Sequence, residues 1–180
     1  MNKVGFLCFA LALSICLQPA VPAQNSTEFL KKLERYIGDK EPDWKMERQR
    51  RDEGIPGPNM PHGVRRHYHL TSGGRTVWVY IFFGATRQGA VRELEQSQRM
   101  LSINASRPVK GLGEEAYQYA KHGGSWLTFR KSNVMAKVSI YLVDWRTVDI
   151  HTANLEAETR EALEIARKFA KHIARVIPSY

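Results

Sequence analysis

A run of seven β-forming residues constrains the fold of this chain more than any other feature. Positions 77–83 read VWVYIFF, and no charged residue interrupts them. β-branched and aromatic side chains favour strands, and a strand without polar alternation is typical of the centre of a sheet, covered on both faces. The alternating segment 64–70 precedes this run, and the turn sequence TSGG at 71–74 separates the two. We therefore expect a β-hairpin with 75–83 as its second strand.

Four further segments carry strand signals, at 44–51, 116–119, 126–130 and 134–143. The last two are joined by Lys131-Ser132-Asn133, and Asn133 is expected to supply any positive φ because asparagine tolerates that region. Side chains alternate along a strand. The inward set of the last strand is therefore Val134, Ala136, Val138, Ile140 and Leu142, or the alternate positions.

Apolar residues recur at helical spacing in three segments, 26–37, 87–102 and 155–176. Hairpins therefore dominate the order of elements, and strands do not alternate one-for-one with helices. This order predicts an α+β fold. We expect a mainly antiparallel sheet of about five to six strands, flanked by N-terminal, middle and C-terminal helices in an α/β/α sandwich. The same order excludes a doubly wound nucleotide-binding fold.

The first 23 residues have the pattern of a secretory signal peptide. Lys3 supplies a positive charge, positions 4–17 are mostly apolar, and Val21 and Ala23 fit a cleavage site after Ala23. An apolar run of this length is shorter than the ~18–20 residues that span a bilayer, although an uncleaved N-terminal anchor is an alternative. We therefore expect a secreted or periplasmic protein whose residues 24–180 form a single α+β domain with a Pro/Gly-rich loop at 53–63.

Both cysteines lie inside this leader, at Cys8 and Cys16. The mature chain then has no disulfide and no thiol nucleophile, and a bacterial envelope protein fits this composition better than a eukaryotic secreted one. Lipid attachment at Cys16 is the less favoured alternative, because the preceding Ile15 is larger than a lipidation signal requires.

The chain is basic, with 27 Lys and Arg against 18 Asp and Glu and a net charge of +9. If segment 44–51 pairs with 64–70, several cations and one tyrosine form a ligand-binding patch for an anionic envelope component or an acidic protein. A solvated surface with no partner is the alternative. Export argues against nucleic acid as a partner, and the basic terminal helix allows peripheral contact with a membrane. The candidate binding residues are Arg48, Arg50, Arg51, Arg65, Arg66 and Tyr68.

His67 and His69 are candidate metal ligands, because residues two apart on a strand point to the same side. No third ligand at a recognisable spacing accompanies them, and two exposed histidines on an edge strand are the alternative interpretation. The sequence contains no Gly-x-Ser-x-Gly and no phosphate-binding loop, so we expect no catalytic residue and no cofactor. Trp78, Tyr80, Trp126 and Phe129 are interpreted as core or sheet-face residues before they are interpreted as a platform for a ligand.

The segment GLGEEAY at 111–117 begins a familiar pattern, which continues with Gly124, with LTFRKSNV at 127–134 and with the Ala-rich helix 162–173. This pattern resembles small secreted or lipid-anchored bacterial domains of the PsbP-like fold and the extracellular sensor domains of some actinobacterial kinases. The resemblance covers residues 111–177, less than half of the chain. It implies helices on either side of an antiparallel sheet, and it supplies no catalytic residues.

These observations favour a secreted, non-enzymatic binding, sensor or accessory domain of the bacterial envelope. A metal-dependent or hydrolytic periplasmic enzyme that uses His67 and His69 is the second hypothesis. An accessory subunit that docks on an envelope protein complex is the third.

Overall fold

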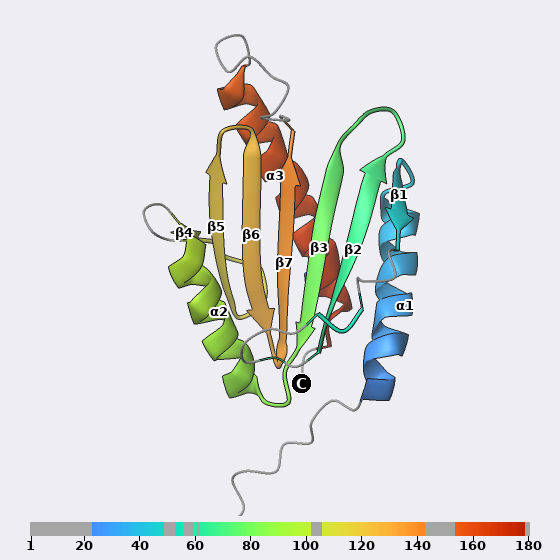
Figure 1. Ribbon diagram of the computed structural model, residues 1–180, viewed down its shortest axis with the longest axis vertical. Helices are drawn as coiled ribbons and strands as arrows, with labels where there is room; N and C mark the ends of the chain where they lie inside the picture. Colours follow the sequence, from blue (N-terminus) through green and yellow to red (C-terminus); the bar gives the residue numbers. More distant parts are fainter. Residues whose placement is uncertain are drawn as a thin grey trace, which may run out of the picture.

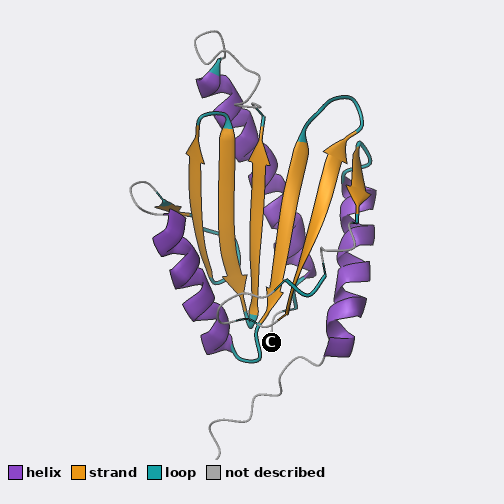
Figure 2. Ribbon diagram, in the orientation of Figure 1, coloured by secondary structure: helices purple, strands orange, loops and turns teal. Residues whose placement is uncertain are grey.

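The computed structural model shows an antiparallel sheet flanked by helices, and it describes residues 23–48, 53–55, 60, 62–101, 106–142 and 154–178 (Figures 1 and 2). The helices are α1 (Ala23–Lys40), α2 (Arg87–Leu101) and α3 (Leu155–Val176). The strands are β1 (Trp44–Glu47), β2 (His62–Leu70), β3 (Thr76–Phe83), β4 (Arg107–Pro108), β5 (Glu115–Lys121), β6 (Gly124–Lys131) and β7 (Val134–Tyr141).

The strands form one seven-stranded sheet in the order β1-β2-β3-β7-β6-β5-β4, and all neighbours are antiparallel. The hairpin β2-β3 and the meander β5-β6-β7 join where β3 pairs with β7. The predicted α+β class with a helix-flanked antiparallel sheet is therefore confirmed. The sheet exceeds the expected five to six strands because β4, only two residues long, is too short to leave a pattern in the sequence.

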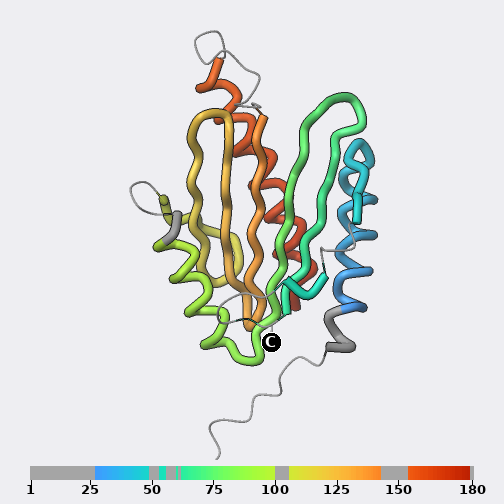
Figure 3. Tube along the Cα trace, viewed as in Figure 1, coloured from blue at the N-terminus to red at the C-terminus, as the bar shows by residue number. Residues whose placement is uncertain are grey.

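One face of the sheet packs against α1 and α3. Alternate residues of β3 and β7 point to this side, and α3 crosses β5, β6 and β7 behind the strands (Figures 1 and 3). Phe169 of α3 lies 5.3 Å from the rings of both Trp44 and Tyr68, between centroids. The first of the two predicted inward sets of β7 lies in this main core, namely Val134, Ala136, Val138 and Ile140, with Leu142 partly buried against it.

Within the described residues, the other face of the sheet is covered only in part, by α2 and by the segment around Ile55 and Met60. Ala90 and Leu94 of this helix pack with Met60, Phe82 and Met135 in a second, smaller apolar cluster. No described helix lies in front of the upper parts of β3, β7 and β6 in Figure 1. The expectation that β3 is covered on both faces therefore holds on the α3 side, but not at Trp78, which is 37% exposed on the other.

The turn between β6 and β7 differs from its prediction. The positive φ of 55° belongs to Ser132 and not to Asn133. Asn133 is instead buried, and its side-chain amide donates a hydrogen bond to the Gly84 carbonyl at 2.7 Å. Because this bond ties the turn to the end of β3, the amide is fixed by a long-range contact that turn statistics cannot reveal.

The predicted signal peptide, the cleavage after Ala23 and the alternative lipid anchor at Cys16 concern residues that lie, except for Ala23, outside the described part of the chain. Within the described residues, no helix is long and apolar enough to cross a membrane.

Candidate functional site

Arg65 and Arg66 are consecutive, and they point to opposite faces of the sheet. Arg66 faces α1 and is only 3% exposed. Its guanidinium lies 2.6 Å from a carboxylate oxygen of Glu34 and 2.7 Å from one of Glu53. Although burial acts in the opposite direction, these two carboxylates raise the pKa of Arg66. Arg66 is therefore an internal ionic contact of the fold.

The other predicted members of the basic patch are also separated. The pairing of β1 with β2 is as expected, but Tyr68 is buried against α3, and Arg48 pairs with Glu34. Arg65 lies on the opposite face, 5.9 Å from the ring centre of Tyr80. Arg50 and Arg51 lie outside the described residues. The described members of the patch therefore do not share one surface.

His67 and His69 do share a face, with ring centroids 6.3 Å apart. Nδ1 of His69 lies 2.9 Å from Oγ1 of Thr76, and Nε2 lies 2.8 Å from a carboxylate oxygen of Glu47. Both ring nitrogens of His69 thus already have polar neighbours. Among the described residues, no cluster of three or more His, Cys, Asp or Glu side chains is arranged to hold a metal ion.

These histidines begin a row of aromatic rings that crosses the sheet on the face opposite α1 and α3. Successive ring centroids are 6.3, 6.2, 5.9, 4.8 and 5.2 Å apart. Aromatic pairs at such distances are worth about 0.5–1.5 kcal/mol beyond their buried area. The aromatic row spans β2, β3, β7, β6 and β5 and consists, in order, of His69, His67, Trp78, Tyr141, Trp126 and Tyr119.

Small residues at the facing positions make room for these rings. Ser139 of β7 lies directly between Trp78 and Trp126 in the strand register, and Gly124 lies opposite Tyr141. A Cβ added at Gly124 would be 3.1 Å from the rings of both Trp126 and Tyr141. A side chain at this position would therefore require the two rings to shift by a few tenths of an ångström.

Next to α2 the aromatic row borders a groove of about 280 Å³. Trp78 and Tyr141 are each 37% exposed, and they are the large apolar side chains most open to solvent in the described part of the chain. Burial raises the pKa of Tyr141, and a hydrogen bond from the Trp126 side chain opposes this. The aromatic groove is lined by Trp78, Tyr80, Ser97, Trp126, Leu127, Thr128, Lys137, Val138, Ser139 and Tyr141.

Two polar groups of the aromatic groove are unusual. Burial lowers the pKa of Lys137, and the nearby Glu93 carboxylate only partly offsets this. Ser97 of α2 is 1% exposed, and its hydroxyl has no hydrogen-bond partner within the described structure. A buried hydroxyl without a partner costs about 1–3 kcal/mol. The groove thus contains a desolvated ammonium and an unsatisfied hydroxyl.

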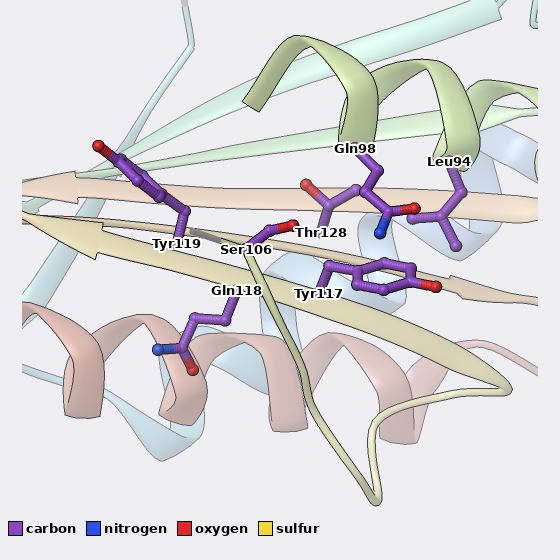
Figure 4. Close-up of a pocket in the computed structure, with 7 residues that line it drawn as sticks. All are labelled: Leu94, Gln98, Ser106, Tyr117, Gln118, Tyr119 and Thr128. Carbon is purple, nitrogen blue, oxygen red and sulfur yellow. The ribbon is translucent and has the colours of Figure 1, made fainter. Parts of the chain in front are cut away.

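A second cavity, where α2 meets β5 and β6, is much smaller. Figure 4 shows Leu94 and Gln98 of α2 pointing toward Tyr117 and Thr128, whereas Gln118 points to the opposite side of the sheet. The volume of this second cavity is about 10 Å³, which is enough for about one water molecule. The contact of α2 with the strands is therefore tight here, whereas the neighbouring aromatic groove, which shares Thr128, is larger.

Besides two aliphatic residues, the lining of the aromatic groove consists of rings, hydroxyls and one ammonium group, and these groups bind ligands by stacking, hydrogen bonding and charge. The sequence interpretation assigned Trp78, Tyr80 and Trp126 to the core or to a sheet face. The period of two in β3 and β6 could have placed them on one face together. It could not show that α2 leaves this part of the face open.

Gly124→Ala is expected to disturb the aromatic row, because the new Cβ would crowd the rings of Trp126 and Tyr141. Near-ultraviolet circular dichroism, which reports fixed tertiary packing, should show an altered aromatic signal. Gly74→Ala is the matched control, since nothing lies within 4 Å of a Cβ there. An unchanged spectrum for both variants would contradict the packing described above.

Lys137→Met is expected to raise the melting temperature at pH 7. Because the pKa of Lys137 is below its ordinary 10.5 in the folded state, the unfolded chain binds the proton more tightly. The wild type should therefore gain stability as the pH rises from the lowered pKa toward 10.5, and the variant should lose this dependence. Lys121→Met, at an exposed position, is the control. A lower melting temperature for Lys137→Met would show that the ammonium stabilises the fold.

Comparison with known proteins gives little further information. No protein-family model and no curated protein matches the chain. A solved structure, that of a GTP-binding regulator from Thermotoga maritima, superposes with a TM-score of 0.44 and 15% sequence identity, over 80% of this chain and 85% of the other. The functional argument therefore rests on the residues of the chain itself.

Proposed function

We propose that this chain is a secreted, non-enzymatic binding domain of the bacterial cell envelope that holds its ligand in the aromatic groove. The observation that carries the proposal is the exposure of Trp78 and Tyr141 beside the buried Ser97 hydroxyl that lacks a partner. The leader at 1–23 and the resemblance of 111–177 to secreted bacterial domains support the envelope location.

Exposed rings in a groove are a sign of binding. Folding usually covers large aromatic side chains, and an apolar surface that stays open beside a few convergent polar groups is the usual form of a ligand site. The Ser97 hydroxyl adds a second reason, because a bound ligand would supply the missing hydrogen bond. The volume of about 280 Å³ is just below the ~300–1,000 Å³ typical of small-molecule sites, which favours a small ligand or the end of a polymer.

A metal-dependent or hydrolytic enzyme is the second candidate. The observation that favours it is the position of His67 and His69 on the open face, at one end of the aromatic row. Stoichiometric metal in the full chain, purified without added ions and lost from a His67→Ala/His69→Ala variant, would favour it. The third hypothesis, an accessory subunit, would bury Trp78 and Tyr141 against an envelope protein.

The proposed function is tested with four soluble probes and two proteins. The proteins are the full chain and its Trp78→Ala/Trp126→Ala variant, and calorimetry measures binding. The probes are a carboxylate-bearing disaccharide, its neutral counterpart, a short-chain anionic phospholipid below its micelle concentration, and single-stranded oligothymidine. We expect at least one probe to bind the wild type and to lose about tenfold or more in affinity, or about 1.4 kcal/mol, with the variant.

The control is Tyr36→Ala on α1, which lies on the opposite side of the sheet and should bind like the wild type. Binding that is the same for all three proteins, or absent with every probe, would contradict the proposal. Circular dichroism will check that the variants are folded. We expect them to be, since Trp78 is 37% exposed and its removal leaves the buried core intact.

A further inference from the structure

The chemistry of the aromatic groove also indicates which class of ligand it takes. We propose that the groove binds a saccharide that carries a carboxylate, with the sugar rings stacked on Trp78, Trp126 and Tyr141 and the carboxylate next to Lys137. This inference rests on the proposed function and makes its ligand specific.

The rings of the groove suit the apolar C–H face of a sugar, and its hydroxyls suit the hydroxyl groups at the rim of the sugar ring. The face of an aromatic ring is electron-rich, and the C–H groups on one face of a pyranose are weakly positive and apolar. Trp126 and Tyr141 meet at 88° with centroids 4.8 Å apart, so the row offers surfaces in more than one direction. The hydroxyls of Ser97, Thr128 and Ser139 line the same groove, where they can bond the rim of sugar hydroxyls.

Other classes of ligand fit less well. A lipid chain would leave the Ser97 hydroxyl and the Lys137 ammonium in contact with hydrocarbon, which is costly for polar groups. Single-stranded nucleic acid needs a positive channel along its backbone, and Lys137 is the one cation among the groove-lining residues that the structure describes. A peptide that adds a strand needs a free sheet edge, and β3, β7 and β6 beneath the groove have neighbours on both sides.

Lys137 is the residue from which we infer that the ligand carries a negative charge. Its ammonium lies 5.6 Å from the ring centre of Phe82 and faces the carboxylate of Glu93 from α2. Glu93 is 2% exposed and has further interactions of its own. A carboxylate that enters the groove would form a charge-assisted hydrogen bond with Lys137 in a partly desolvated site, where such bonds are strong. A single ammonium suits one carboxylate better than a phosphate, which proteins usually bind with several donors.

The test compares two disaccharides that differ in one group. N-acetylglucosaminyl-N-acetylmuramic acid carries a lactyl carboxylate, and diacetylchitobiose has the same sugar rings without it. We expect the full chain to bind the acidic disaccharide about tenfold more tightly than the neutral one. Lys137→Met should remove this preference and leave the weaker binding of diacetylchitobiose unchanged.

Two further variants keep the result interpretable. Lys45→Met, an exposed cation of β1 outside the groove, should retain the preference. Ser97→Ala should weaken both disaccharides by a similar factor without lowering the melting temperature, because its hydroxyl has no partner to lose in the fold.

Equal binding of both disaccharides, or a preference that persists in Lys137→Met, would overturn the carboxylate assignment. If only the phospholipid or the oligonucleotide binds, and this binding requires Trp78 and Trp126, the saccharide inference fails while the proposed binding function stands. If no probe depends on the two tryptophans, the proposed function itself fails.

Discussion

Arg66→Ala is expected to lower the free energy of unfolding by about 3–5 kcal/mol, the range observed when one partner of a buried ion pair is removed. The guanidinium of Arg66 contacts the carboxylates of Glu34 and Glu53, and the Glu34 side chain is only 9% exposed. Without Arg66, the Glu34 side chain of α1 would remain buried, with the exposed Arg48 as a cationic neighbour. Urea denaturation monitored by circular dichroism gives the free energy of unfolding directly.

Arg65→Ala is the matched control, because Arg65 has the same chemistry one position earlier and lies on the open face. Its contact with the Tyr80 ring is worth about 0.5–1 kcal/mol at an exposed site, and Arg65 is less buried than Arg66, so we expect a clearly smaller loss than for Arg66→Ala. Equal losses for the two variants would mean that Arg66 is not buried against α1. The assignment of faces along β2, on which the position of the aromatic row depends, would then be wrong.

Gly113→Ala is expected to destabilise the protein by about 3 kcal/mol or more. Gly113 has a φ of +61°, and a non-glycine residue held in such a conformation costs of order 1–3 kcal/mol. The added Cβ would also overlap the carbonyl oxygen of Arg130, and overpacking typically costs a further 1–3 kcal/mol. Thermal unfolding should show the loss as a clear fall in melting temperature.

Gly111→Ala separates the two effects at Gly113. Gly111 also has a positive φ, of 79°, but nothing lies within 4 Å of a Cβ at this position. Only the conformational cost of about 1–2 kcal/mol applies there. A Gly113→Ala variant that is no less stable than Gly111→Ala would show that the turn before β5 is not pressed against β6.

The elements of the fold follow from local patterns in the sequence. The uninterrupted run 77–83 marks a central strand, and the apolar spacing of 155–176 marks α3. These signals are local, since a period of 2 or 3.6 residues needs only one segment. The short β4 escaped prediction because two residues leave no periodic pattern in the sequence. The positive φ at Ser132 escaped it because the neighbouring Asn133 is held by Gly84, which is distant in the sequence.

The candidate site was less predictable than the fold. Closeness in sequence suggested that Arg65 and Arg66 act together, but the period of two along β2 places them on opposite faces. Conversely, Trp78, Trp126 and Tyr141 are far apart in the sequence, and only the register of β3, β7 and β6 brings them together. Their exposure also depends on which part of the sheet α2 packs against. The sequence of α2 does not specify this position.

The most direct test of the central claim is ¹⁹F nuclear magnetic resonance of the full chain labelled with 5-fluorotryptophan. The chain has four tryptophans, and single Trp→Phe variants assign their signals. We expect N-acetylglucosaminyl-N-acetylmuramic acid to shift the signals of Trp78 and Trp126. The signal of Trp44, buried on the α3 side of the sheet, should stay in place. Shifts confined to Trp44 would contradict a binding site on the aromatic face, and no shift at high disaccharide concentration would contradict the saccharide as its ligand.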